Sequence, residues 1–257
     1  METVKQIKIL KITDNMPEEK LDKVVVEKPI NIFVNLEFYA ALMCSPSELK
    51  ELAAGFLFSE AVISSARDIK SIEEKYGDRV CVVLNHEFSK DSESLKARST
   101  GCGNGSVHMN ALENRNFKPA EDGKRFTVKS IAGFMKEFNH MSGIFRETGG
   151  VHSCAICFDG GIEYFSEDIG RHNALDKVIG KAILKGIDLK ESVILTTGRI
   201  SSDIVVKAAV AGVPMVVSHS APTDLALEIA EAANITVLGF VRGCRMNVYC
   251  CSKRIIS

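Results

Sequence analysis

The sequence predicts an α/β protein: a mixed, mostly parallel sheet with helices on both faces, preceded by a smaller N-terminal α+β unit. From residue 193 onward, short apolar runs of strand length alternate with amphipathic segments of helix length. Gly186 and Gly212 stand where helices of that length would end. We place the N-terminal unit at 1–118 and the α/β core at 119–257, because 114–124 is a polar stretch that holds Pro119 and Gly123.

Composition excludes several classes of protein. The 257 residues are 46% hydrophobic and 25% charged, which is ordinary for a globular protein. A net charge of -1 gives no bulk attraction to nucleic acid or to an anionic membrane. The first ten residues lack the apolar core of a signal peptide, and the run 208–217 is too short to span a bilayer. We therefore expect a cytoplasmic protein with reduced cysteines.

In the N-terminal unit, residues 1–35 resemble strands separated by polar turns, and 78–85 is a short buried strand. Ser45 is the expected N-cap of a helix, with Pro46 at its first position and Glu48 completing a capping box. Its expected buried face is Leu49, Leu52, Ala53, Phe56 and Leu57. The stretch 86–101 is polar throughout and is expected to be a mobile loop that presents Cys102.

The core is expected to begin with an amphipathic helix over 127–146, buried through Ile131, Phe134, Met135 and Phe138. Strands 151–158 and 162–165 follow, joined by a turn at Asp159-Gly160-Gly161. Asn173 is then the expected N-cap of a helix that ends at Gly186. The alternating elements after it are strands 193–197, 214–218 and 235–240 and helices 203–211 and 224–233.

Loops between the strands and helices of such a sheet gather at one edge, where ligands bind. The three loops here offer Arg171, His172, Asn173, Gly198, Arg199, Ser201, Ser202, Ser218, His219, Ser220 and Thr223. Helix N-termini with two arginines and several hydroxyls favour a phosphate or nucleotide site. The alternative is that the hydroxyls are simply N-caps.

The segment 240–245 follows the last expected strand and would suit a pyrophosphate or a heterocycle. Its residues are Phe240, Val241, Arg242, Gly243, Cys244 and Arg245. Two arginines around a glycine, with an aromatic ring beside them, are typical of such ligands. The alternative is a basic loop that faces water.

The eight cysteines differ in setting. Cys102 lies among glycines after Arg98, which suits a nucleophilic thiol, although an unused surface cysteine is the alternative. Cys154 and Cys157 have Cys-x-x-Cys spacing but fall in an expected strand, where they would point to opposite faces, so we interpret them as core. Neither Cys250 nor Cys251 receives a role.

Several motifs together resemble the FdhD/NarQ family of formate dehydrogenase accessory sulfurtransferases. The most specific is Glu167–Gly180, EDIGRHNALDKVIG. The others are TGGVH at 148–152, TGRISS at 197–202, Lys207-Ala208, SHSAPTDL at 218–225, GFVR at 239–242 and Asn247-Val248-Tyr249. The N-terminal half matches more loosely, through 45–60 and the loop around Cys102.

The resemblance implies a cytoplasmic, dimeric protein with a cytidine deaminase-like core that helps to mature molybdenum enzymes. Cys102 stands where family members carry a persulfide received from a cysteine desulfurase. The sulfur would pass to bis-molybdopterin guanine dinucleotide, destined for formate dehydrogenase. Phe240–Arg245 stands where the family binds that cofactor, with the loop residues named above beside it, and His172 or His219 is the hypothesised proton carrier.

One departure from the family leaves two hypotheses open. The family often has Cys-Gly-x-Cys in the loop, whereas Gly105 replaces the second cysteine here. A lone thiol can carry a persulfide but cannot release it by forming a local disulfide. The chain is therefore expected to be a sulfurtransferase or, alternatively, a non-catalytic carrier of the cofactor. Zinc-dependent deamination is rejected, because His152-Ser153-Cys154 lacks the required glutamate and no proline precedes Cys154.

Overall fold

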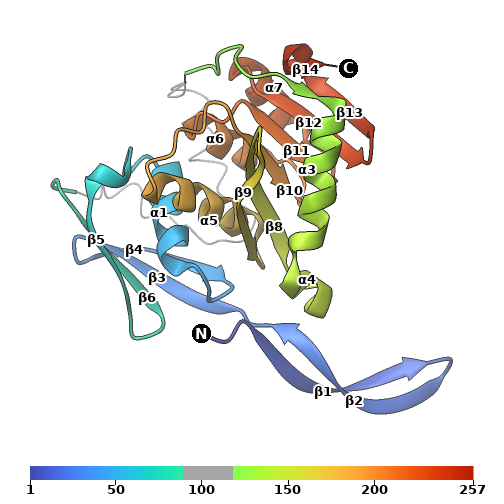
Figure 1. Cartoon of the computed structure of the whole chain (residues 1–257). Helices are drawn as coiled ribbons and strands as arrows, with labels where there is room; N and C mark the ends of the chain where they lie inside the picture. The colour runs from blue at the N-terminus through green and yellow to red at the C-terminus, as the bar shows by residue number, and fades with distance from the viewer. Residues whose placement is uncertain (89–117, 257) are drawn as a thin grey trace.

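The computed structural model describes residues 1–88 and 118–256. Cys102 and the loop that carries it lie outside these residues. The described core is built on a six-stranded sheet of order β13-β12-β11-β10-β8-β9 (Figure 1). In chain order, its strands are β8 (His152–Phe158), β9 (Gly161–Asp168), β10 (Val193–Thr196), β11 (Met215–Ser218), β12 (Thr236–Arg242) and β13 (Arg245–Cys250).

The sheet is mixed rather than mostly parallel. Only the pairs β10–β11 and β11–β12 are parallel. β8 pairs antiparallel with β9 and β10, and β13 pairs antiparallel with β12. The tight turns after Phe158 and after Arg242 force these antiparallel hairpins, since a parallel neighbour needs a long crossover. We expected only a loop at 240–245, but it is the tip of the β12–β13 hairpin.

Helices cover both faces of this sheet, as expected. On one face lie α5 (Arg171–Leu184), α6 (Ser202–Val210) and α7 (Asp224–Ala232), whose apolar side chains form one core with the sheet. On the other face, α3 (Val128–Met141) buries Ile131, Phe134, Met135 and Phe138 against the strands. Among the described residues, no helix is both long and apolar enough to cross a bilayer.

The N-terminal part contains a second sheet of order β4-β3-β6-β5, covered by α1 (Leu49–Ser59). Its strands are β3 (Lys28–Val34), β4 (Glu37–Cys44), β5 (Ile69–Lys75) and β6 (Arg79–Leu84). The five residues expected on the buried face of α1 are all buried. Before this sheet, β1 (Val4–Thr13) and β2 (Met16–Val25) form a long hairpin that projects from the body (Figure 1). The division at 118/119 stays a prediction.

Two expected helix caps are wrong, for one physical reason. α1 begins at Leu49 after Glu48, whose φ is 55° and which makes no capping bond. Ser45 is fully buried instead: its N–H donates to Asp168 Oδ2 and its hydroxyl accepts from Ile169 N–H. α5 starts two residues before Asn173, with Gly170 as N-cap. In both cases, the polar side chain makes tertiary hydrogen bonds and therefore does not cap the start of its own helix.

The helix expected over 127–146 is two helices. α3 ends at Met141 and α4 (Gly143–Thr148) starts after Ser142. The carboxylate of Glu167 accepts hydrogen bonds from the Ser142 hydroxyl and from the N–H groups of Ile144 and Phe145. An anion at these N–H groups stabilises a new helix start, which breaks the continuous helix at Ser142.

α1 and α5 cross at two glycines, and this crossing joins the two sheets. A Cβ atom added to Gly55 would lie 1.8 Å from the Asp176 carbonyl oxygen, and one added to Gly180 would lie 1.9 Å from that of Glu51. Only residues without a Cβ permit this backbone approach.

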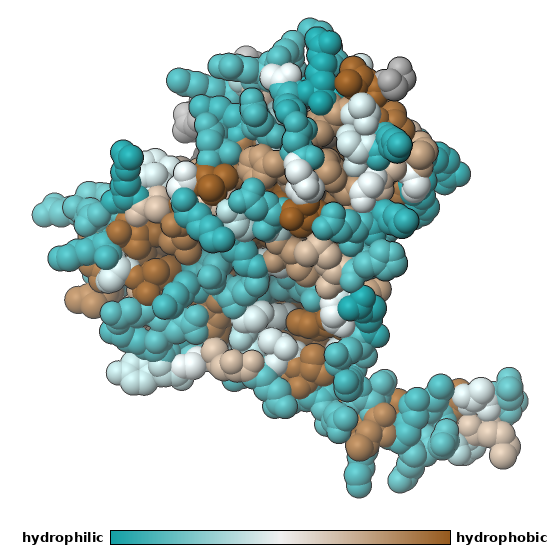
Figure 2. Space-filling model, in the orientation of Figure 1, coloured by the Kyte–Doolittle hydropathy of each residue, from teal (hydrophilic) through white to brown (hydrophobic). Residues whose placement is uncertain are grey.

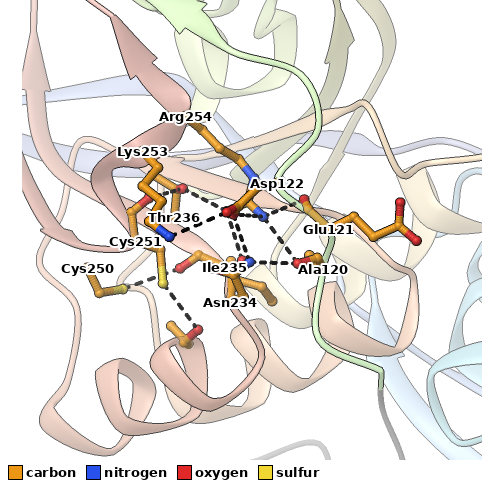
Figure 3. Close-up of polar contacts among 11 residues, drawn as sticks. Ala120, Glu121, Asp122, Asn234, Ile235, Thr236, Cys250, Cys251, Lys253 and Arg254 are labelled. Atoms are coloured by element: carbon orange, nitrogen blue, oxygen red, sulfur yellow. Dashed lines mark hydrogen bonds and ion pairs between the residues drawn. The ribbon is translucent and has the colours of Figure 1, made fainter.

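The last described residues are tied to residues 120–122, which lie just after the residues outside the described structure (Figure 3). Arg254 is 1% exposed and its guanidinium donates to the carbonyl oxygens of Glu121 and Asn234. The Asn234 amide in turn donates to Ala120 O and to Asp122 Oδ1. Residues 120–122 are thereby held against β12 and the C-terminal turn.

Gly55→Ala should lower the free energy of unfolding by at least about 3 kcal/mol, because the methyl group forces the two helices apart. Urea unfolding followed by circular dichroism would measure the loss. Gly133→Ala in α3 is the matched control, since a Cβ there meets nothing within 4 Å; it should be neutral or stabilising by up to about 1 kcal/mol. Equal midpoints for Gly55→Ala and the wild type would contradict the close crossing.

Candidate functional site

One edge of the large sheet collects the polar loops. The loops after β10, β11 and β12 leave the sheet there, because these three strands are parallel. The antiparallel hairpin β8–β9 adds its two ends at the same edge, where His152 pairs with Asp168. The expected clustering of loops is confirmed, and the hairpin contributes residues that a parallel sheet would not.

A cavity of about 520 Å³ opens at this edge, between α3, α4 and the loops. Its lining includes the turn Gly149-Gly150, His152, Thr197 and His219, and α3 contributes Asn139. The remaining lining residues are Phe138, Ser142, Phe145, Val151, Ser153 and Ile169. Of the residues predicted from sequence to bind a ligand, only His219 lines this cavity.

Arg171, the first residue of α5, packs over the loop that follows β10. A Cβ added to Gly198 would lie 3.0 Å from the Arg171 Cβ and Cδ atoms, so glycine leaves room for the side chain. Two buried donors here, Arg171 Nε and Ser201 Oγ, have no hydrogen-bond partner in the described structure. Unsatisfied donors at the starts of α5 and α6 could bind a phosphate group.

His172 and Asn173 have different surroundings. His172 Nε2 lies 3.3 Å from Asp203 Oδ2, without the geometry of a hydrogen bond. The Asn173 amide donates to Met43 O and to Asp168 Oδ1, so this predicted ligand residue is occupied in holding the chain. Arg199 is exposed in the loop after β10.

Asp168 fixes the start of α5 from inside the protein. Its carboxylate is fully buried and lies 2.6 Å from the equally buried Lys177 Nζ. It also accepts hydrogen bonds from Gly170 N–H, the Asn173 amide and Ser45 N–H. These partners satisfy a charge that would otherwise be very costly to bury. The Ile169-Gly170-Arg171 turn is thus held rigidly beside the cavity.

The predicted segment 240–245 is strained and mostly exposed. Phe240 has φ of 53° in an irregular stretch of the β12–β13 ladder, its side chain is 38% exposed, and the turn residue Cys244 is exposed. Arg242 Nη1 donates to His219 O, which ties the tip to the loop after β11. Val241 is buried in the core, and its carbonyl accepts from His219 Nδ1.

Ser218 and His219 hold neighbouring loops together. The Ser218 hydroxyl donates to Gly198 O at 2.7 Å and accepts from Ser220 N–H. His219 contacts Asn139 Oδ1 through Nε2 at 2.6 Å, in addition to its bond to Val241. Both nitrogens of His219 are therefore engaged, whereas His172 Nε2 makes no hydrogen bond in the described structure, which favours His172 as the more available of the two.

His152 was missed as a site residue, although it belongs to the quoted TGGVH motif. Its Nδ1 lies 3.3 Å from Thr197 Oγ1 at the wall of the cavity. Burial, and after it the charges of Arg171 and His172, lower the pKa of His152 below its usual range. A lowered pKa leaves His152 neutral near pH 7, so the positive charge beside it comes from Arg171, which favours an anionic ligand at this edge.

Most of the described cysteines are poor nucleophiles. Burial raises the pKa of Cys44 and of Cys250 to about 12, and it raises the pKa of Cys154, Cys157 and Cys251 as well. Cys154 and Cys157 pack into the cores on opposite faces of the sheet, as expected. Cys244 is the exposed thiol among the described residues. Cys102 lies outside them.

The chain is similar to known proteins along nearly its whole length. The family model of the FdhD/NarQ family matches residues 25–256. A protein of Bacillus pumilus named sulfur carrier protein FdhD is 40% identical, over 92% of this chain and 91% of its own. One of the same name from Listeria monocytogenes is 35% identical over 99% and 100%. A crystal structure from Desulfotalea psychrophila, assigned as a formate dehydrogenase accessory protein, superposes with TM-score 0.83 at 29% identity, covering 99% and 100% of the two chains.

Lys177→Met should lower the free energy of unfolding by about 3–5 kcal/mol, because it leaves the Asp168 carboxylate buried without its cation. Asp168→Asn/Lys177→Met removes both charges and should recover at least about 1 kcal/mol of that loss. Denaturant unfolding of the two variants and the wild type measures both effects. A double variant no more stable than Lys177→Met would show that the charge pair is not the source of the cost.

His152 should make the protein less stable in mild acid. Because the pKa of His152 is lower in the folded state, the unfolded chain binds a proton first as the pH falls below about 6.5. Each unit by which folding lowers this pKa reduces the unfolding free energy in acid by about 1.4 kcal/mol. His152→Gln should show a shallower fall in unfolding free energy than the wild type between about pH 7 and pH 5. Parallel pH profiles would contradict a lowered pKa, and NMR titration of His152 provides an independent check.

Proposed function

The chain belongs to the FdhD/NarQ family, and we propose that it is a sulfur carrier that serves formate dehydrogenase. The observation that carries this proposal is similarity to named sulfur carrier proteins over nine-tenths or more of both chains. We propose further that Cys102 accepts a persulfide from a cysteine desulfurase. The sulfur then passes to bis-molybdopterin guanine dinucleotide, which is a substrate here.

The loading step needs one accessible thiolate. The Cys102 thiolate attacks the outer sulfur of the desulfurase persulfide, which forms the Cys102 persulfide and releases the desulfurase thiolate. Five of the seven described cysteines have raised pKa values, which disfavours the thiolate at neutral pH. Their chemistry supports Cys102 as the carrier, with exposed Cys244 as the thiol to test against it.

The electropositive edge supports the cofactor-binding part of the proposal. Arg171 Nε and Ser201 Oγ are donors without partners among the described residues, and Arg242 lies at the same edge. Such groups suit the pyrophosphates of the guanine dinucleotide. The residues proposed to bind it are those expected from sequence: Arg171, His172, Asn173, Gly198, Arg199, Ser218, His219 and Phe240–Arg245. His172 is the proposed proton carrier, and Asn173 and Ser218 would act by positioning the loops.

The remaining features of the proposal come from the family resemblance. The protein would act in the cytoplasm as a homodimer, with a cysteine desulfurase as donor and formate dehydrogenase as recipient system. It would need neither nucleic acid nor a membrane as partner. The near-neutral net charge of -1 is consistent with the absence of both.

One observation favours a second function. Gly105 replaces the second cysteine of the loop, so a loaded sulfur has no local thiol to displace it. A carrier that binds the cofactor and performs no sulfur chemistry would keep the cationic edge and make Cys102 dispensable.

Incubation with a cysteine desulfurase and cysteine should add one sulfur atom to the Cys102 peptide, detected by mass spectrometry. Cys102→Ala should carry none, and Cys244→Ser should load like the wild type. Cys102→Ala should also lose cofactor sulfuration while still binding guanine nucleotide. No added sulfur, or sulfur spread evenly over the other cysteines, would favour the non-catalytic carrier.

A further inference from the structure

The hairpin of residues 4–25, called the arm below, lacks the support that two-stranded ribbons need. It carries five large apolar side chains that are 41–73% exposed: Ile7, Leu10, Ile12, Met16 and Leu21. Figure 2 shows brown apolar patches among teal polar side chains along its length. A lone two-stranded hairpin is marginally stable in water. Among the described residues, β1 and β2 pair only with each other.

Within the part of the chain that the structure describes, the contacts of the arm with the body lie at its root. Lys23 Nζ lies 2.8 Å from Glu147 Oε2 of α4. A Cβ added to Gly150 would lie 2.8 Å from Val25 Cγ1, so the root packs against the turn that lines the cavity. Beyond the root, the arm points away from both sheets (Figure 1).

The register shows which backbone groups of β2 face away from β1. Residue pairs of an antiparallel ladder alternate between those that exchange backbone hydrogen bonds and those, called open here, whose N–H and C=O groups point outward. Val26 N–H donates to Thr3 O, so that pair is hydrogen-bonded and the next pair, Val4 with Val25, is open. The open positions of β2 are Pro17, Glu19, Leu21, Lys23 and Val25. Pro17 fits this assignment, because a proline at an open position removes no bond from the hairpin. The outer edge of β2 therefore presents the N–H and C=O groups of residues 19 and 21 and the C=O of residue 23, whose N–H donates to Asp22 Oδ1.

The charges along β2 are complementary to themselves. Residues 19–23 read Glu-Lys-Leu-Asp-Lys. If two such strands run antiparallel about Leu21, Lys20 meets the partner's Asp22. Glu19 meets the partner's Lys23, which also keeps its contact with Glu147 of its own chain. β1 differs, because its charged residues are Lys5, Lys8 and Lys11, which would repel a second β1.

We propose that β2 pairs with β2 of a second copy of this chain, antiparallel across a two-fold axis at Leu21. The product is a four-stranded sheet β1-β2-β2-β1, in which Leu21 exchanges two backbone hydrogen bonds with the partner's Leu21. On either side, the Glu19 N–H donates to the carbonyl oxygen of the partner's Lys23, and the two Leu21 side chains meet on one face. The pairing satisfies the open edge and widens a ribbon that is marginal alone.

We choose a second copy of the chain as the partner, because pairing of β2 with β2 gives a closed dimer. The same strand serves both partners, so the interface is isologous and ends at two chains, and the charge match is with the chain's own sequence. Pairing of β2 with β1 of another copy would leave free edges and grow into filaments. The inference goes beyond the sulfur-carrier proposal and gives the proposed homodimer a defined interface.

Sedimentation velocity on the full chain tests the pairing. The wild type should sediment as twice 28.1 kDa. Leu21→Pro removes an outward N–H without touching the hairpin ladder, and should raise the dimer dissociation constant at least about tenfold. Leu10→Pro is the matched control: Leu10 occupies an open position on β1, so this variant should dimerise like the wild type.

Charge exchange provides a second, independent test. Lys20→Glu and Asp22→Lys should each weaken the dimer, whereas Lys20→Glu/Asp22→Lys should restore it, because the exchanged charges again meet opposite ones. Hydrogen exchange should show slower exchange at the outward amides of Glu19 and Leu21 than at those of Lys8 and Leu10.

Four results would overturn the proposal. They are a monomeric wild type, Leu21→Pro behaving as Leu10→Pro does, a double charge variant as weak as either single one, and assemblies that keep growing with concentration. A dimer indifferent to every arm variant would reject this interface while leaving the proposed homodimer intact. The persulfide assay on Cys102 is unaffected by any of these outcomes.

Discussion

The Asp168 carboxylate is the group on which the arrangement of the cavity edge depends. It lies at the end of β9, where it binds Lys177 of α5, Ser45 from the N-terminal part and Gly170 at the start of α5. A charge with no solvent access is tolerated only where several donors surround it, so all these donors must arrive together. The glycine crossing of α1 and α5 brings Ser45 close enough, because Gly55 and Gly180 let the helix backbones approach. Folding of the two sheets is thereby coupled through one buried anion. A second buried ion pair joins α5 to α6: Asp176 lies on α5, as Lys177 does, and Lys207 lies on α6.

This coupling explains why the cavity edge can be both rigid and electropositive. Arg171 follows directly after the anchored turn, so its position is fixed by Asp168 rather than by a partner of its own. His152 lies near it with a lowered pKa, and Arg171 Nε is left without a hydrogen bond. A guanidinium held at a fixed position without a partner of its own is a group that an anionic ligand would satisfy. The two charged residues of this turn therefore differ in their contacts: Asp168 is fully buried and holds the turn, whereas the partly exposed Arg171 packs over the loop after β10.

Local sequence patterns predicted the elements well and failed where distant residues intervene. The apolar stripes of α1 and α3 are buried as expected, since periodicity indicates which face of a helix packs against a core. The caps at Ser45 and Asn173 were wrong because Asp168, more than a hundred residues from Ser45, binds both. The split at Ser142 depends on Glu167 in another element. Strand direction was predicted only in part, because the short turn after β12 was mistaken for a loop. The cavity residues His152, Thr197 and Asn139 come from three separate parts of the chain, and no spacing in the sequence indicates that they line the same cavity.

The distribution of cysteines bears on how a single-thiol carrier could remain specific. A desulfurase persulfide reacts with whichever thiolate reaches it, so selectivity requires that other thiols be buried or protonated. Burial does both for Cys44, Cys154, Cys157 and Cys250, all of which pack within the cores or beside Asp168. With Gly105 in place of a second loop cysteine, a sulfur loaded on Cys102 would stay until an acceptor removes it. An acceptor held by its pyrophosphates at a fixed cationic edge fits that requirement, because release then depends on the acceptor's arrival rather than on a competing thiol.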